Sequence, residues 1–318
     1  MKLGEAIDDY VAWRQAQGAK FTTARNLLRQ FVRDIGAEAD CDEISRDQVL
    51  AFLVGQGPRT RHGDNKAYAL AGFWRFAISR GLAEASPLPS SERRPPLLAP
   101  PHIYSRAQLR RLFDPRNVEI ALIGTKQLDL NTFRTLLLLL YGAGLRFSEA
   151  TGLLRDECDL KASVLTIRDT KFYKSRLVPI GMPLGMALAR HLSQPPGQRF
   201  APDGGGYLLS NRDGTRLASS TVQTAFDRLR RAADVRGSAG GRSAPRMHDL
   251  RHSFAVHRLT AWYREGADVQ RLLPVLSTYL GHSDLEGTKV YLTMTPELLN
   301  QASMLFARFA HGGADARA

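Results

Sequence analysis

Cysteine is scarce in this chain of 318 residues, and long apolar runs are missing from it. Cys41 and Cys158 stand alone, without histidines at ligand spacing, so neither a disulfide framework nor a zinc site is indicated. The longest leucine run, 136–140, is far shorter than the roughly 20 apolar residues of a membrane span. The N-terminus also lacks the apolar core of a signal peptide, so we expect a cytoplasmic protein without a membrane segment.

Basic residues are in clear excess. The chain carries 44 Lys and Arg against 31 Asp and Glu, for a formal net charge of +13. Most of the excess lies in residues 103–318, which hold 30 basic and 19 acidic side chains. A charge of this size favours a polyanionic partner, although a basic surface can also serve solubility alone. The length is sufficient for two domains, and 43% apolar content supports ordinary buried cores.

The first 85 residues show the periodicity of amphipathic helices and no competing strand pattern. A third helix is expected to begin after Ser45, whose hydroxyl can cap its first amides. A fourth, over 67–80, is expected to bury five side chains, namely Tyr68, Leu70, Phe73, Trp74 and Ile78. Six prolines between 81 and 101 then prevent a helix from continuing. We therefore assign 1–85 to a helical domain, 86–102 to a linker and 103–318 to a second domain.

The second domain combines helices with a small sheet. A leucine-rich helix over 131–141 is expected to end at Gly142 and Gly144, which leaves Arg146 at a helix junction. Ser148 is expected to cap a helix over 149–154. Further elements are expected as a hairpin of strands 164–168 and 176–180, a strand at 207–210, and helices at 220–233, 269–280 and 296–309. The predicted fold class is mainly α with a small β-sheet.

A segment from Met247 to Phe254 carries the first chemical signal. His248 and Arg251 lie three residues apart and are neighbours on one face of a helix. Imidazole can move a proton near neutral pH, and a guanidinium group binds two oxygens of a phosphate or carboxylate. The plain alternative is a helix with Leu250 in the core and with His248 and Arg251 solvated or paired with acids. The motif alone leaves both interpretations open.

Three further motifs lie around this segment. Gly-Leu-Arg146-Phe-Ser-Glu149 precedes it, Leu-Gly-His282 follows it, and Tyr291 comes nine positions after His282. In this order and spacing, Gly-Leu-Arg-x-Ser-Glu, His-x-x-Arg-His, Leu-Gly-His and the trailing Tyr resemble the tyrosine recombinases, or phage integrase family. The resemblance covers residues 103–310, and the stretches around His282 and after Tyr291 are similar to integrases of mobile elements. N-terminal residues resemble the family only in general character.

This resemblance implies an architecture. The helical domain would be the core-binding, SAM-like domain that clamps duplex DNA from the side opposite an α+β catalytic domain. The last helix, 296–309, would dock into a neighbouring protomer, which couples assembly to activity. Its plain alternative is packing on its own domain. The partners implied are double-stranded DNA, other copies of the chain in a homotetramer, and accessory DNA-binding or co-recombinase proteins.

The resemblance also implies roles for individual residues. Tyr291 would attack a DNA phosphate held by two arginines, His248 would take its proton, and Lys171 would protonate the departing 5′ oxygen. His282 would donate a hydrogen bond to the phosphate, and Glu149 would support the pocket. The implied catalytic set is therefore Arg146, Lys171, His248, Arg251, His282 and Tyr291, with Glu149 as a supporting residue. Between Lys171 and Lys174 this chain has Phe172 and Tyr173, where the family commonly has small residues.

Four basic residues are candidates for DNA contacts, and solvated surface is their alternative: Lys174, Arg176, Arg228 and Arg231. No metal, ATP or other cofactor is expected, because the arginines neutralise the phosphate and the covalent link conserves bond energy. The predicted function is a site-specific DNA recombinase or integrase that works through a 3′-phosphotyrosyl intermediate. A type IB topoisomerase shares this chemistry and is one alternative. A DNA-binding accessory protein without catalysis is the other.

Overall fold

The structure is a computed structural model that describes residues 1–19, 21–54, 61–89, 100–168, 175–193, 206–237, 244–282, 285–293, 300 and 303–304. The chain divides into two units, Met1–Leu98 and Ala99–Ala318, and the division falls within the segment predicted as a linker. Among the described residues, no helix combines the length and apolar character that crossing a membrane requires. The two units are described separately.

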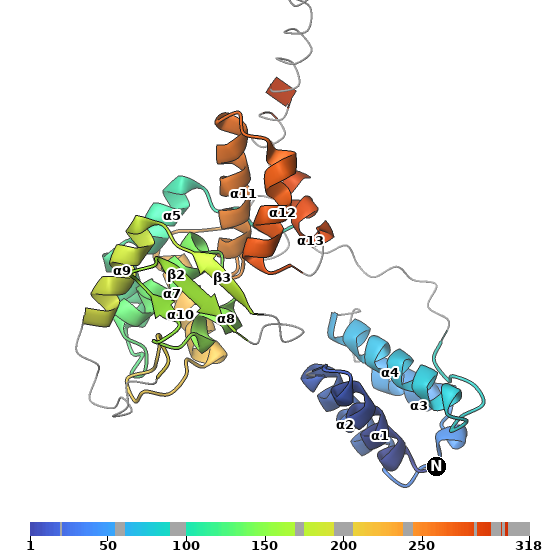
Figure 1. Cartoon of the computed structure of the whole chain (residues 1–318). Coiled ribbons are helices and arrows are strands. Elements are labelled where there is room, and N and C mark those ends of the chain that lie inside the picture. Colours follow the sequence, from blue (N-terminus) through green and yellow to red (C-terminus); the bar gives the residue numbers. More distant parts are fainter. Residues whose placement is uncertain are drawn as a thin grey trace, which may run out of the picture. The chain divides into compact units, whose positions relative to one another are not determined.

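The first unit is a group of helices (Figure 1). Its elements are α1 (Leu3–Ala16), α2 (Thr22–Ile35), a 3-10 turn (Cys41–Glu43), α3 (Arg46–Leu53) and α4 (Arg61–Ser79). Ser45 caps α3 as predicted: its hydroxyl accepts from the Gln48 amide at 3.2 Å, and the Gln48 side chain accepts from the Ser45 amide at 2.8 Å. This capping box fixes where α3 begins.

The core of this unit corrects part of the prediction for α4. Leu70, Phe73 and Trp74 are buried as expected, but Tyr68 is 68% exposed and Ile78 is 40% exposed. At about 100° per residue, Tyr68 lies roughly 200° around the helix from Leu70 and so on the opposite side. Ile78 lies at the margin of the apolar face. Helix type was therefore predicted correctly, while the width of the buried face was overestimated.

The second unit contains nine α-helices and three strands within its described residues. The helices are α5 (Arg106–Phe113), α6 (Pro115–Leu122), α7 (Leu130–Gly142), α8 (Phe147–Gly152), α9 (Met182–Ser193), α10 (Ser219–Ala232), α11 (Asp249–Arg264), α12 (Val269–Leu280) and α13 (Glu286–Lys289), followed by a 3-10 turn (Val290–Thr293). The strands are β1 (Cys158–Asp159), β2 (Val164–Ile167) and β3 (Arg176–Pro179). A mainly α fold with a small sheet is confirmed.

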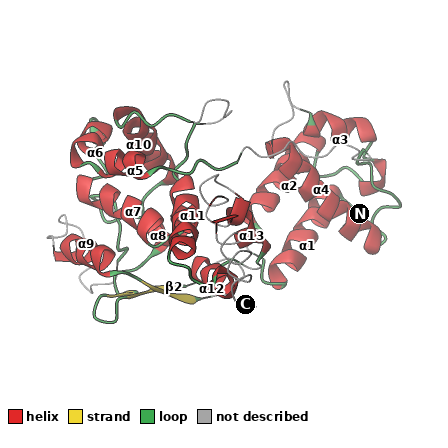
Figure 2. Cartoon of the chain, turned by 90° about the horizontal axis from the view of Figure 1, so that it is seen from above, coloured by secondary structure: helices red, strands yellow, loops and turns green. Residues whose placement is uncertain are grey.

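The sheet is antiparallel in the order β1-β2-β3. Leu165 of β2 pairs with Val178 of β3, and both side chains are fully buried, so the inner face of the hairpin joins the core. The sheet lies along one side of the unit, between α9 and α12 (Figure 2). Ile167 pairs with Arg176, which places Arg176 at the start of the returning strand.

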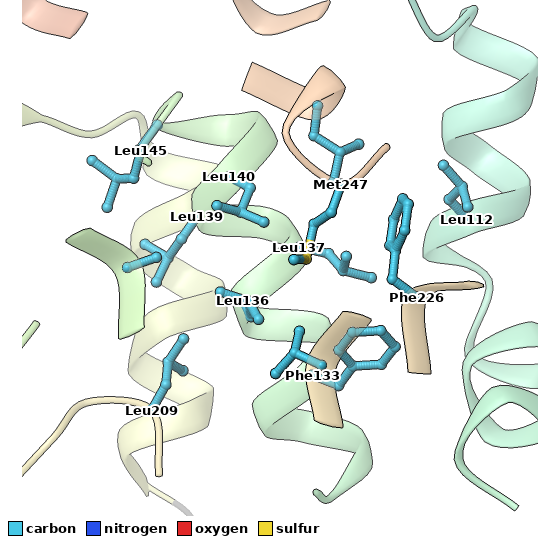
Figure 3. Packing of buried hydrophobic residues seen from close by; sticks show 14 of the residues in the cluster. Leu112, Phe133, Leu136, Leu137, Leu139, Leu140, Leu145, Leu209, Phe226 and Met247 are labelled. Atoms are coloured by element: carbon cyan, nitrogen blue, oxygen red, sulfur yellow. The ribbon is translucent and has the colours of Figure 1, made fainter. Parts of the chain in front are cut away.

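The leucine-rich helix α7 lies in the middle of the core. Its leucines are buried against residues from three other segments, Leu112 of α5, Phe226 of α10 and Met247 before α11 (Figure 3). Burial of so many large side chains makes α7 a rigid support for the loop that follows it. In Figure 1, α11 and α12 lie side by side, with α13 beside α12.

Two local predictions for this unit were wrong. Helix α8 begins at Phe147 with Arg146 as its N-cap residue, because the Arg146 amide donates to the Glu149 carboxylate at 2.9 Å, so Ser148 is not the cap. No strand forms at 207–210, where only isolated pairings of Tyr207 with Leu154 and of Ser210 with Arg216 occur. Most of the helix predicted at 296–309 lies outside the described residues.

Candidate active site

The loop after α7 positions the first arginine. Gly144 has φ +59°, and a Cβ atom there would lie 2.5 Å from the ring of Phe254, so the chain passes too close for any side chain. This tight passage brings the Gly144 carbonyl within 2.6 Å of Nη1 of Arg251. It also directs the next residues, Leu145 into the core and Arg146 toward the end of α12. A glycine at 144 is therefore a requirement of the site.

Two arginines far apart in the chain meet at the C-terminal end of α12. Nη2 of Arg251 donates to the Leu280 carbonyl, and Nη2 of Arg146 donates to the Gly281 carbonyl, both at 2.7 Å. Burial and the neighbouring charge of Arg146 lower the pKa of Arg251 to about 10, so it stays cationic at neutral pH. The side chain of Arg251 is 2% exposed and that of Arg146 is 31% exposed. Arg146 can therefore contact a ligand from solvent.

Glu149 is the negative charge among these cations. Its carboxylate accepts from Nη1 and Nη2 of Arg176 at 3.0 and 2.9 Å and from Nη1 of Arg146 at 2.7 Å, while Arg251 Nη1 lies 4.0 Å away. Burial alone would raise the pKa of Glu149, but the hydrogen bonds and charge of Arg176, with those of Arg146, hold it at about 2. The carboxylate is thus ionised and fixes the orientation of both arginines.

Tyr291 reaches the same place from the 3-10 turn after α13. Its side chain is almost fully buried, and its hydroxyl lies 3.1 Å from Nδ1 of His252. Burial raises the pKa of the phenol, while the positive charges of Arg251 and Arg146 act to lower it. The two arginines therefore stabilise a phenolate at this position relative to an equally buried tyrosine without them.

Two histidines, His252 and His282, contact Tyr291, and a third, His248, contacts His252. The ring of His282 lies nearly parallel to that of Tyr291 with centroids 6.1 Å apart, and the ring of His248 lies perpendicular to that of His252 at 4.8 Å. His282 is oriented by Thr288, whose buried hydroxyl lies 2.7 Å from its Nδ1. Burial, together with the nearby charge of Arg251, lowers the pKa of His248, so its neutral form can accept a proton.

The structure brings together six of the seven residues predicted for this site: Arg146, Glu149, His248, Arg251, His282 and Tyr291. Lys171, the seventh, lies outside the described residues, as does Lys174. Glu149 contacts the pocket through two arginines, Arg146 and Arg176.

The other residues expected at the DNA face behave differently from one another. Arg176 is turned inward, where it binds Glu149 and donates to the Tyr279 carbonyl at 2.9 Å, so its expected place on a DNA-contacting surface is corrected. Arg228 and Arg231 are exposed on α10, and their side chains donate to the carbonyls of Ile123 and Asp227 at 2.9 and 3.1 Å.

Sequence reasoning assigned no role inside the pocket to three residues that the structure places there. His252, Thr288 and Arg176 contact Tyr291, His282 and Glu149 respectively. One signal was available for His252, because it lies four residues after His248 and so on the same helix face. Nothing in the spacing pointed to Thr288 or to the inward turn of Arg176.

Comparison with known proteins decides the family. The model of the phage integrase family matches residues 117–297, which include every site residue described above. The chain belongs to the phage integrase family. This confirms the resemblance found in the sequence, and it makes the chain a tyrosine-type site-specific DNA recombinase. Its two arginines, three histidines and buried tyrosine are thus the candidate active site of a member of that family.

Relatives match the integrase along nearly its whole length. A protein of Sinorhizobium fredii named integrase/recombinase y4rE is 35% identical over 98% of this chain and 97% of its own. Tyrosine recombinase XerD of Pseudomonas aeruginosa is 32% identical over 84% of each chain.

Among solved structures, the Tn1549 transposon integrase in complex with a circular intermediate DNA has a TM-score of 0.66 at 18% identity, covering 97% of this chain and 99% of that one. A lambda integrase from a tetramer bound to a Holliday junction has a TM-score of 0.62 at 17% identity, covering 89% and 78%. At these identities the likeness concerns the fold alone.

Proposed function

We propose that this integrase cuts and rejoins duplex DNA at specific sites through a 3′-phosphotyrosyl intermediate formed on Tyr291. The observation that carries the proposal is the placement of the Tyr291 phenol where the charges of Arg146 and Arg251 both act on it. The two guanidinium groups are held by consecutive carbonyls at the end of α12. A phosphate bound by them would lie beside the tyrosine hydroxyl.

The chemistry follows from these groups. The Tyr291 oxygen attacks the phosphorus, a bond to the 3′-side phosphate forms, and the bond to the 5′ oxygen of the next nucleotide breaks. His248 takes the phenol proton, Lys171 supplies a proton to the departing 5′ oxygen, and His282 donates to a non-bridging oxygen. The arginines neutralise the charge that builds up in the transition state. Attack by a 5′ hydroxyl on the phosphotyrosine reverses the step and rejoins a strand.

The proposed reaction needs neither ATP nor a metal ion. Each transesterification exchanges one phosphoester bond for another, so the energy of the cleaved bond is kept in the covalent intermediate. The positive charge that a metal would bring to the phosphate is supplied by two guanidinium groups. Glu149, ionised and buried, keeps Arg146 oriented before DNA arrives, and Nη1 of Arg251 lies 4.0 Å from the same carboxylate.

Duplex DNA as the substrate and a tetramer as the working assembly belong to the same proposal. The Tn1549 integrase and the lambda integrase, which share the fold, are described bound to a circular intermediate DNA and as a tetramer on a Holliday junction. The basic excess of residues 103–318 fits a polyanionic substrate. Arg228 and Arg231 on α10, and Lys174, which lies between β2 and β3 in the sequence, are the proposed contacts to the DNA backbone.

Covalent capture tests the proposal and requires no choice of recognition sequence. A pool of nicked duplexes with random sequence lets a short 5′-hydroxyl fragment diffuse away after cleavage, so a phosphotyrosyl enzyme accumulates and resists denaturing detergent. We expect the native chain to trap a narrow set of sequences, and Tyr291→Phe to bind the same duplexes without forming the adduct. Binding without any adduct by the native chain would support a silent accessory protein instead. Trapping of arbitrary sequences would support a type IB topoisomerase.

A further inference from the structure

His252 has no role in the chemistry described above, yet its ring lies within hydrogen-bond distance of the reacting oxygen. It follows Arg251 directly in α11 and lies one turn after His248. Its Nδ1 lies 3.1 Å from the Tyr291 hydroxyl, and the two rings are 5.6 Å apart at 56°. We propose that His252 is a positioning residue, which accepts a hydrogen bond from the protonated Tyr291 hydroxyl and holds the phenol in attack position beside the arginines. This inference rests on the proposed function of Tyr291.

Burial makes this contact necessary. The Tyr291 side chain is 2% exposed, so water has little access to its hydroxyl. Arg251 also hydrogen-bonds to this oxygen but can only donate, so the hydroxyl proton needs an acceptor elsewhere, and a buried donor without an acceptor is strongly unfavourable. His252 supplies an acceptor for that hydroxyl. The histidine thereby allows a polar nucleophile to be stored inside the domain in one orientation.

The electrostatic surroundings define the direction of the hydrogen bond. Burial, with the charges of His248, Arg246 and Arg251, lowers the pKa of His252 to about 4, against a smaller opposing effect of Asp249. The imidazole is therefore neutral at pH 7 and has one accepting nitrogen. Burial raises the pKa of the phenol above its ordinary value of 10, so Tyr291 is protonated and donates. Nδ1 of His252 is then the acceptor, and its ring proton lies on Nε2.

The same values argue against His252 as the general base. A base with a pKa of about 4 facing a phenol with a pKa above 10 leaves the proton on the phenol by a wide margin. The contact keeps Tyr291 protonated and oriented until a phosphate is bound. Removal of the proton is left to His248, as proposed above.

Two polar substitutions of His252 separate positioning from proton transfer. In His252→Asn, the amide oxygen takes the place of Nδ1 and can accept from Tyr291, whereas in His252→Gln the amide lies nearer the place of Nε2. Asparagine and glutamine do not titrate, so neither can act as a base. His252→Leu removes the hydrogen bond at similar volume. Thermal melting of each variant, with circular dichroism, shows that the compared chains are folded.

The measurement is single-turnover cleavage of a captured nicked duplex at saturating full-length protein, with the duplex Kd determined separately. We expect His252→Gln and His252→Leu to slow cleavage about 10-fold to 100-fold at unchanged Kd, because a loosely held nucleophile is rarely aligned. His252→Asn should recover most of the native rate, and its pH–rate profile should have the native shape. If His252→Asn is as slow as the other two, or if all three match the native rate, the inference is wrong.

This experiment separates the inference from the function on which it rests. If the native chain forms no covalent adduct with any duplex, the proposed function itself fails. If the native chain forms the adduct, Tyr291→Phe abolishes it, and the His252 variants do not follow the expected order, only the positioning role fails.

Discussion

The guanidinium of Arg176 and the carboxylate of Glu149 form a two-point contact, with Nη1–Oε1 and Nη2–Oε2 distances of 3.0 and 2.9 Å, in the interior of the second unit. Nη1 of Arg146 donates to Oε1 of the same carboxylate at 2.7 Å. One buried acid thus orients a strand residue and a loop residue 30 positions apart in the chain. Loss of the Glu149 carboxylate would leave both guanidinium groups hydrogen-bonded to backbone carbonyls but without this negatively charged partner.

Glu149→Gln is therefore expected to destabilise the protein by about 3 kcal/mol. This magnitude follows from the cost of leaving the buried charges of Arg176 and Arg146 without their carboxylate. It also follows from the pKa of Glu149, which is held at about 2 instead of 4.5. The stabilisation is fully present above pH 4.5 and is lost as the pH falls toward 2. Urea denaturation at pH 7 measures the change, with Glu119→Gln on the exposed face of α6 as the control. Equal midpoints for the two variants would contradict the role assigned to Glu149.

Acid should destabilise this protein well above the pH at which carboxylates titrate. Burial, as the main cause, lowers the pKa of His252 and of His257 from 6.5 to about 4. Both imidazoles therefore stay neutral in the native state, whereas in the unfolded chain they take up protons below pH 6.5. Stability should then fall between pH 6.5 and 4 by up to about 3 kcal/mol per pH unit for the two together. Denaturant midpoints at pH 7.5, 6.0 and 5.0 test this. A flat response would contradict it, and His257→Gln should reduce the slope.

Gly144→Ala tests the tight passage over Phe254. A methyl group would lie 2.5 Å from that ring on a backbone with φ +59°, so we expect a loss of about 2 to 4 kcal/mol. Gly124 is the matched control, because its φ is +78° and nothing lies within 4 Å of an added Cβ. Gly124→Ala should cost only the backbone strain, about 1 kcal/mol. Equal losses would show that the contact with Phe254 is not restrictive.

Thr288 is expected to matter through His282 alone. Thr288→Val keeps the shape of this fully buried side chain but removes the hydroxyl that lies 2.7 Å from Nδ1 of His282. Loss of this hydrogen bond should make the orientation of the imidazole less well defined and slow adduct formation about tenfold, equivalent to about 1.4 kcal/mol. Thr288→Ser retains the hydroxyl and should keep most of the activity. Single-turnover cleavage compares the two, and equal rates would exclude an orienting role.

Much of the fold could be predicted because periodic patterns and caps are local. The helix predicted at 269–280 is α12, Val269–Leu280, and Ser45 caps α3 as expected. The errors arose where contacts between segments distant in the sequence determine whether a residue is buried or a strand forms. Tyr68 has the apolar character of a core residue but faces outward, and the apolar run at 207–210 makes only isolated pairings with other described residues instead of a ladder.

The site was predictable only as far as its motifs extend. Arg146, Arg251, His282 and Tyr291 were found from their order and spacing, and they lie together around the end of α12. Their supports were not found, since Arg176 looks in the sequence like any basic residue in a hairpin. Only the fold places its guanidinium, 27 residues from Glu149 in the chain, against that carboxylate.

The central claim is that the phenol of Tyr291 forms the covalent bond to DNA, and mass spectrometry of the trapped adduct tests it most directly. Trypsin should release residues 290–308 as one peptide, in which Tyr291 is the sole tyrosine. After digestion of the DNA, we predict that this peptide carries the mass of a nucleotide joined through its 3′ phosphate. A nucleotide found on a peptide with another tyrosine, such as Tyr279 or Tyr141, would contradict the account.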